Sequence, residues 1–311
     1  MNDVPTVSVI VIFFNEERFL LEAVDSVRDQ TFDDWELLLC DDGSTDASSA
    51  LARQLSDTDA RISYLEHPAH VNRGMSATRN LGLRVARGRY VALLDADDVW
   101  LSNKLEEQVQ LMDEHPDAGM VCGAPQYWRS WSGERSGDRL VPVGAPQEAL
   151  VHPPRLMTML YPLGDGHAPC PSDLLLRRSI VNEVGGFEEQ FRGDRQLYED
   201  QAFLAKLYLH AAVYVSGSTW IRYRERPDSC VASVSAAGQY HVVRRYFLLW
   251  LGDYLKDHGV TDRSVLSAWA KADSAYRWPS RTSRALGRRT IASRALGRRI
   301  IDGLRRRLPA A

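Results

Sequence analysis

Gly88-Arg89-Tyr90-Val91-Ala92-Leu93-Leu94-Asp95-Ala96-Asp97-Asp98 is an apolar run that ends abruptly in acid. Tyr90 to Leu94 has the length and composition of a buried strand, and a glycine and an acidic residue bound it on either side. Carboxylates at the edge of an apolar sheet repel one another and resist losing water, so they require a cation or hydrogen-bond donors nearby. A hard divalent cation that also carries water and phosphate oxygens would meet this requirement.

Strand-like and helix-like segments alternate on both sides of this stretch. Apolar runs predict strands at 7–14, 35–40, 62–65, 90–94 and 119–122, and helical spacing predicts helices at 19–27, in a segment ending at 55, and at 76–85 and 104–112. Such alternation is typical of a mostly parallel sheet with helices on both faces. In open sheets of this kind, ligands bind outside the carboxyl ends of the strands, where the acidic triplet falls.

A second predicted strand also runs into acid, because residues 35–40 are followed by Asp41-Asp42-Gly43-Ser44-Thr45-Asp46. For one such cluster alone, an acidic first turn of the next helix is a sufficient explanation. The recurrence at a second strand favours a shared site at adjacent strand ends. No strand is followed by a Gly-x-Gly-x-x-Gly or P-loop pattern, which argues against a dinucleotide oxidoreductase or a P-loop kinase.

Four motifs in this order and spacing resemble the bacterial family-two inverting glycosyltransferases: 7–17, Asp41 to Asp46, Asn72 to Asn80, and Leu94 to Asp98. The resemblance continues through Gly185-Gly186-Phe187 and Tyr198 to Gln201 as far as about residue 235. It implies the GT-A fold, with a Rossmann-like sheet, a nucleotide-sugar donor, and Mn²⁺ or Mg²⁺ as cofactor.

Carried over position by position, the resemblance implies roles for several residues. Asp41 would accept a hydrogen bond from the donor base, Asp95 would lie near the ribose, and Asp97 would bind the metal. Arg79 would lie near the diphosphate. The other positions expected on the donor side are Phe14, Asn15, Glu16, Asp42 and Ala96. Residues 223–229 resemble a family segment near the donor phosphates that often has histidine where this chain has Arg226, so Arg224 and Arg226 are candidates for phosphate contacts.

An inverting displacement needs a base that takes the proton of the acceptor hydroxyl. The pair Glu199-Asp200 opens a predicted helix at 201–209, where the helix dipole favours a carboxylate. An acidic first turn without catalytic function is the alternative. Since the family pattern puts its base at the aspartate of this pair, we expect Asp200 to be the catalytic residue.

The sequence suggests a division into three parts. Residues 1–235 would form the glycosyltransferase domain, with a nucleotide-sugar-binding half at 1–123 and an acceptor half at 124–235. Residues 236–280 would form a helical extension, and residues 281–311 a basic tail, either amphipathic or disordered. The tail contains ten arginines and one acid, whereas the remaining residues carry 28 basic and 40 acidic side chains. A basic amphipathic helix can lie on an anionic membrane surface, and a solvated tail is the equal alternative. We expect no nucleic-acid partner, because the body is acidic.

The four cysteines lie far apart without metal-ligand or redox spacing, and no signal-like segment stands at the amino terminus. We therefore expect a cytoplasmic protein, peripheral at the inner face of the membrane if its tail binds lipid. The expected reaction transfers a sugar, most often from a UDP-sugar, to a hydroxyl of a saccharide, a lipid-linked glycan or another acceptor, as in polysaccharide biosynthesis. The alternatives are a catalytically silent nucleotide-sugar-binding protein and a sugar nucleotidyltransferase.

Overall fold

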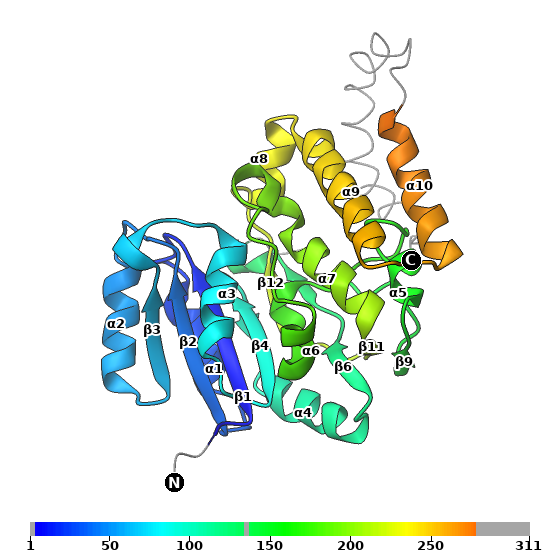
Figure 1. Ribbon diagram of the computed structural model, residues 1–311. Helices are drawn as coiled ribbons and strands as arrows, with labels where there is room; N and C mark the ends of the chain where they lie inside the picture. Colours follow the sequence, from blue (N-terminus) through cyan, green and yellow to red (C-terminus); the bar gives the residue numbers. More distant parts are fainter. Residues whose placement is uncertain (1–3, 134–136, 278–311) are drawn as a thin grey trace, which may run out of the picture. The chain divides into compact units, whose positions relative to one another are not determined.

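Two β-sheets and the helices around them form the part of the chain that the computed structural model describes, residues 4–133 and 137–277 (Figure 1). Contacts divide the chain into two compact units, with the division between Trp269 and Ala270. The first unit contains both sheets. The strands are β1 (Val7–Phe13), β2 (Trp35–Asp41), β3 (Ile62–Glu66), β4 (Tyr90–Asp95), β5 (Val99–Trp100), β6 (Ala118–Cys122), β7 (Gln126–Trp128), β8 (Arg139–Leu140), β9 (Ala149–Val151), β10 (Leu175–Arg177), β11 (Ala212–Val215) and β12 (Ile221–Arg224).

The larger sheet has eight strands in the order β3-β2-β1-β4-β10-β6-β11-β9. Strands β1, β2, β3 and β4 are parallel, and β6 is parallel to β11. The short strand β10 pairs antiparallel with both β4 and β6, and β9 pairs antiparallel at the edge. Every residue of β1 and β2 is buried, which explains their continuous apolar sequences. The predicted mostly parallel sheet is confirmed.

Ten α-helices are found among the described residues: α1 (Leu20–Arg28), α2 (Ser48–Thr58), α3 (Met75–Val85), α4 (Lys104–Glu114), α5 (Arg155–Met159), α6 (Arg178–Glu183), α7 (Glu199–His210), α8 (Cys230–Ala236), α9 (Tyr240–Asp257) and α10 (Arg263–Arg277). Four short 3₁₀ segments, η1 (Pro68–His70), η2 (Ser130–Ser132), η3 (Pro171–Asp173) and η4 (Gly193–Tyr198), lie between them. Helix α3 packs on β1 and β2, and Figure 1 shows it crossing the face of the sheet. The expected flanking helices are therefore present.

The two acidic clusters lie at the same edge of the sheet but not on adjacent strands. Strand β1 separates them, because Phe13 pairs with Asp41 on one side and Ile12 pairs with Asp95 on the other. At the usual strand spacing the two ends lie about 10 Å apart. The expectation that the two clusters follow adjacent strands is therefore wrong, because β2 lies on one side of β1 and β4 lies on the other.

The smaller sheet, in the order β5-β12-β7-β8, was not expected from the sequence. Its strands are two to four residues long, which is too short to produce a recognisable alternation. Strand β5 directly follows the acidic triplet, and β12 pairs with it through Ile221 and Trp100. This pairing brings the segment after residue 221 to the acidic end of β4.

Helix α9 packs against η4 and α7, so a helical segment does follow residue 235 as expected. The predicted domain boundaries themselves stay predictions, and the basic tail at 281–311 lies outside the described residues. Among the helices of the described ranges, none combines the length and the apolar character needed to cross a membrane.

The tight turn after β2 generates a stability prediction. Gly43 has φ +80°, and a Cβ there would lie 2.8 Å from the backbone of Asn72 and of His70. Gly185 has φ +75° with nothing within 4 Å of its Cβ position. We expect Gly185→Ala to lower the free energy of unfolding by about 1–2 kcal/mol, the cost of the left-handed backbone. Gly43→Ala should cost at least about 2 kcal/mol more, because the facing backbone cannot move aside easily.

Urea denaturation of the two variants beside the wild type measures this difference. Equal losses in the two variants would contradict the crowding that the structure places at Gly43.

Candidate active site

Asp98 anchors the acidic end of β4. Its side chain is buried, and its carboxylate accepts hydrogen bonds from the Ser172 hydroxyl at 2.6 Å and from the backbone N–H of Arg224 at 2.8 Å. Burial, together with Asp97 and Asp95, raises its pKa well above the usual value. Asp95 and Asp97, by contrast, retain side-chain exposures of 27% and 28%. The last residue of the triplet therefore supports the loop, and the other two carboxylates reach the open side.

Arg79 joins the end of β4 to the start of α7. Its guanidinium is buried, donates to Asp95 at 2.6 Å, and also forms an ion pair with Glu199. The guanidinium carbon lies 5.3 Å from the centre of the Phe187 ring. Burial raises the pKa of Glu199, and the positive charge of Arg79 opposes that rise. Arg79 thus links residues far apart in the sequence, and this link fixes where α7 begins relative to the triplet.

Asp200 differs from its neighbour Glu199 in its partners. Its carboxylate accepts from the backbone N–H of Gln201 at 2.7 Å and from the Gln201 side-chain amide at 3.1 Å. Within the described ranges it makes no salt bridge, whereas Glu199 is paired with Arg79. Burial raises the pKa of Asp200 to about 6, so the carboxylate titrates near neutral pH. A half-buried carboxylate of this kind can accept a proton.

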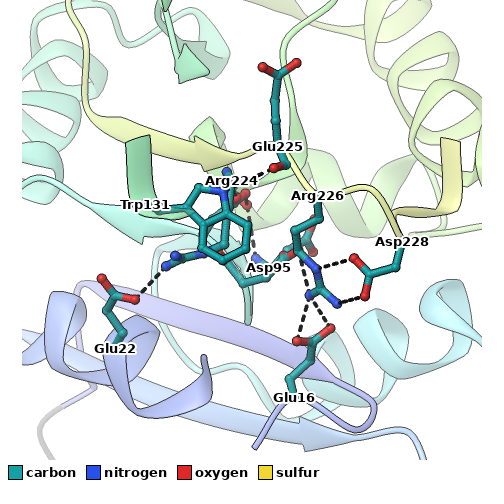
Figure 2. A network of polar contacts seen from close by, with 11 residues as sticks. Glu16, Glu22, Asp95, Trp131, Arg224, Glu225, Arg226 and Asp228 are labelled. Carbon is teal, nitrogen blue, oxygen red and sulfur yellow. Dashed lines mark hydrogen bonds and ion pairs between the residues drawn. The ribbon is translucent and has the colours of Figure 1, made fainter. Parts of the chain in front are cut away.

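Arg226 lies between three carboxylates at the open side of the triplet (Figure 2). One nitrogen, Nη1, donates to both oxygens of Glu16 at 2.8 Å and contacts Asp97 Oδ2 at 3.2 Å. Its other edge donates to the two oxygens of Asp228 at 3.0 and 2.9 Å. Glu16 and Asp97, two positions expected on the donor side, are therefore brought together. Arg226, at the position where the resembling family segment often has histidine, connects them.

Arg224 is buried, and its guanidinium contacts a carboxylate, a backbone oxygen and aromatic rings. Its guanidinium donates to Glu22 and to the backbone oxygen of Asp97, each at 2.6 Å. It also lies over the rings of Phe19 and Trp128, at 4.5 and 4.4 Å from their centres. These contacts attach β12 to α1 and to the acidic loop. A phosphate contact by Arg224 stays a prediction, and its observed contacts are structural.

Asp41 lies at the end of β2 with no exposed surface. Its carboxylate accepts hydrogen bonds from the backbone N–H of Ser44 at 2.8 Å, from the Ser49 hydroxyl, and from the Tyr64 hydroxyl at 2.9 Å. Ser49 and Tyr64 were not singled out from the sequence. Their hydroxyl groups come from α2 and β3, and only the fold brings them to this carboxylate.

Asp42 points toward the loop that precedes α3. Its carboxylate accepts from the backbone N–H groups of Arg73, at 2.6 Å, and Gly74, at 3.0 and 3.1 Å. Burial raises its pKa, and these hydrogen bonds oppose the rise. Asp42 therefore shapes the loop between η1 and α3.

The turn after β1 carries the remaining donor-side positions. Phe14 is 45% exposed, and Asn15 has a left-handed backbone with φ 57°. The Asn15 side chain accepts from the backbone N–H of Thr45 at 2.7 Å, and Phe19 is the residue that precedes α1. The Asn15 side chain thus reaches the neighbouring turn and makes no cap on α1. Ala96 is buried between the two exposed aspartates.

The residues at Asp97 fit a divalent cation that arrives with phosphate. Burial and the charge of Asp95 raise the pKa of Asp97, so added positive charge would stabilise the ionised form. Across the described part of the chain, no three His, Cys, Asp or Glu side chains gather as a preformed metal site. Mg²⁺ in phosphate-binding sites takes one or two carboxylates and completes its shell with phosphate and water, so Asp97 with a diphosphate suffices.

Comparisons with known proteins show the family of the chain. The family model described as "Glycosyl transferase family 2" matches residues 8–185, more than half of the chain. The putative teichuronic acid biosynthesis glycosyltransferase TuaG of Bacillus subtilis is 40% identical over 121 residues, 38% of this chain and 46% of TuaG. The Escherichia coli UDP-Glc:alpha-D-GlcNAc-diphosphoundecaprenol beta-1,3-glucosyltransferase WfgD is 38% identical over 106 residues, 34% of this chain and 40% of WfgD. The chain therefore spans less than half the length of these two relatives.

Solved structures share the fold. S. aureus TarS in complex with UDP-GlcNAc has a TM-score of 0.55 and 21% identity, and the match covers 78% of this chain and 66% of that chain. The mannosyltransferase PcManGT from Pyrobaculum calidifontis, in complex with GDP-Man and Mn²⁺, has a TM-score of 0.54 and 17% identity over 95% of this chain and 81% of that chain. The fold is that of the GT-A glycosyltransferases. On the family match, the chain belongs to glycosyl transferase family 2.

Proposed function

We propose that this chain transfers a sugar from a nucleoside-diphosphate sugar to the hydroxyl group of a saccharide or lipid-linked glycan. The preferred donor is a UDP-sugar, and the transfer inverts the configuration at the anomeric carbon. The observation that carries the proposal is the arrangement of carboxylates near the end of β4: Arg226 joins Asp97 to Glu16, and Arg79 joins Asp95 to Glu199, the neighbour of Asp200 in the sequence. The UDP-GlcNAc bound in TarS and the GDP-mannose and Mn²⁺ bound in PcManGT support the donor class. The lipid-linked acceptor in the name of WfgD supports the acceptor class.

The donor side of the proposed site begins at Asp41 and ends at Asp97. Asp41 would accept a hydrogen bond from the base, which requires the surrounding turn to move because Asp41 has no exposed surface in the ligand-free structure. Asp95 would lie near the ribose. A divalent cation held by Asp97, Mn²⁺ or Mg²⁺, would act as a Lewis acid on the diphosphate oxygens and stabilise the leaving group. Arg226 supplies a further positive charge at the same place, 3.2 Å from Asp97.

The acceptor side of the proposed site depends on Asp200. In a single displacement the base must remove the proton of the acceptor hydroxyl as that oxygen attacks the sugar. Gln201 donates to both oxygens of Asp200 and fixes the orientation of the carboxylate. Glu199 is unsuited to this task because its carboxylate is buried against Arg79. Asp200 is therefore the proposed base and Glu199 a residue that supports it.

Two substitutions test this assignment. Asp200→Asn keeps the size of the side chain and can keep one of its two accepted hydrogen bonds, but it cannot accept a proton, so kcat should fall by roughly 10²–10⁴-fold with donor affinity retained. Glu199→Gln should reduce kcat much less. Donor titration followed by calorimetry, beside turnover of a UDP-sugar, measures both effects. Loss of donor binding in Asp200→Asn would assign Asp200 a structural role, and full activity in that variant would sink the assignment.

The pH dependence gives an independent prediction. Since burial raises the pKa of Asp200 to about 6, kcat/KM should fall as the pH is lowered through about 6, where the base becomes protonated. Glu16 also has a pKa raised to about 6, so Glu16→Gln is the matched control. The acidic limb should persist in Glu16→Gln and be absent from the residual rate of Asp200→Asn. If the acidic fall of kcat/KM disappears in Glu16→Gln, the titrating group belongs to the donor side of the site.

A further inference from the structure

Arg226 compensates the charge of the proposed cation site in the ligand-free structure. Figure 2 shows its guanidinium between Glu16 and Asp228, and the same group lies 3.2 Å from Asp97 Oδ2. Only 14% of the Arg226 side chain is exposed. One cation therefore serves three carboxylates. Burial raises the pKa of Glu16 to about 6, and the hydrogen bond and positive charge of Arg226 oppose that rise.

A divalent cation on Asp97 and the guanidinium of Arg226 would occupy neighbouring positions on the same carboxylate. Like charges at such separations repel strongly, and a low-dielectric surrounding increases the repulsion. Without further negative charge, binding of the divalent cation would therefore have to break the contact between Arg226 and Asp97. A diphosphate adds the missing negative charge, so both cations can then be accommodated.

The contacts of Arg226 differ in length, and the longest is the one that the divalent cation would replace. Its contacts with Glu16 and Asp228 measure 2.8 to 3.0 Å, whereas the contact with Asp97 measures 3.2 Å. Arg226 can therefore release Asp97 and keep two charged partners. Asp228 is 67% exposed, so the ion pair that Arg226 would keep lies on the solvent-facing side of the cluster.

We propose that Arg226 is a built-in counter-cation that competes with the divalent cation for Asp97, so that the divalent cation binds tightly only together with a nucleoside diphosphate. This inference rests on the proposed function, since it takes Asp97 as the cation ligand. It assigns to Arg226 a task beyond a phosphate contact: the arginine keeps the empty site neutralised and couples the cation to the donor.

The experiment measures Mn²⁺ binding directly, by electron paramagnetic resonance of free Mn²⁺ in titrations with manganese chloride alone and with added UDP. Arg226→Gln removes the charge, Arg226→Lys keeps it without the planar fork, and Arg222→Gln removes an exposed charge from β12, the strand that precedes Arg226. Without UDP, Arg226→Gln should bind Mn²⁺ about tenfold or more tightly than the wild type. Arg226→Lys and Arg222→Gln should stay as weak as the wild type. Thermal melting confirms that each variant is folded.

Three results would overturn the inference. The first is an unchanged nucleotide-free Mn²⁺ affinity in Arg226→Gln. The second is an equal gain in Arg226→Lys, since a rearranged loop and not the charge would then be the cause. The third is an equal gain in Arg222→Gln, which would indicate a general effect of net charge.

The same titrations separate this inference from the proposed function. Suppose that the wild type binds Mn²⁺ with UDP and transfers sugar, while Arg226→Gln shows no gain in nucleotide-free Mn²⁺ affinity. That result would refute the competition and leave the proposed function in place. If Mn²⁺ binds neither the wild type nor any variant, even with UDP, both the cation assignment and the competition that depends on it are refuted.

Discussion

Negative charge at the carboxyl end of β4 is the constraint on which the arrangement of the site depends. The sheet edge holds Asp95, Asp97 and Asp98 next to an apolar interior, and burial raises the pKa of the last two. Each carboxylate is compensated in a different way. Asp98 receives hydrogen bonds from η3 and β12, Asp95 receives Arg79, and among the described side chains Asp97 receives the 3.2 Å contact of Arg226, the longest that this arginine makes with its three carboxylates. Asp97, the least compensated of the three, is the carboxylate that we propose as the cation ligand.

The same compensation connects distant parts of the chain. Arg79 joins β4 to α7 and so orients the carboxylate next to Glu199, which is Asp200. Arg224 joins β12 to α1 through Glu22 and to the backbone oxygen of Asp97. The observed contacts of these two buried arginines are structural, and the expected position of Arg79 near the diphosphate stays a prediction. Arg226, which is nearer to solvent, is the arginine whose partners can change.

Much of the fold could be predicted from the sequence because its central strands are buried on both faces. Strand β4 was expected at 90–94 and ends one residue later, at Asp95. The acidic clusters were also visible, since each directly follows an apolar run. The smaller sheet could not be predicted, because strands such as β12 are too short for a periodic pattern. For the same reason the contact of Arg226 with Glu16 and the support of Asp98 by Ser172 were not foreseen.

The most direct test of this account is a crystal structure of the chain with Mn²⁺ and UDP, in which the anomalous signal of manganese locates the cation. The account predicts manganese bound to the Asp97 carboxylate at about 2.0–2.3 Å, in contact with the diphosphate, with Arg226 withdrawn from Asp97 but still paired with Glu16 or Asp228. Manganese bound elsewhere, or a diphosphate that lies away from Asp97 while Arg226 keeps its contact with that carboxylate, would contradict it.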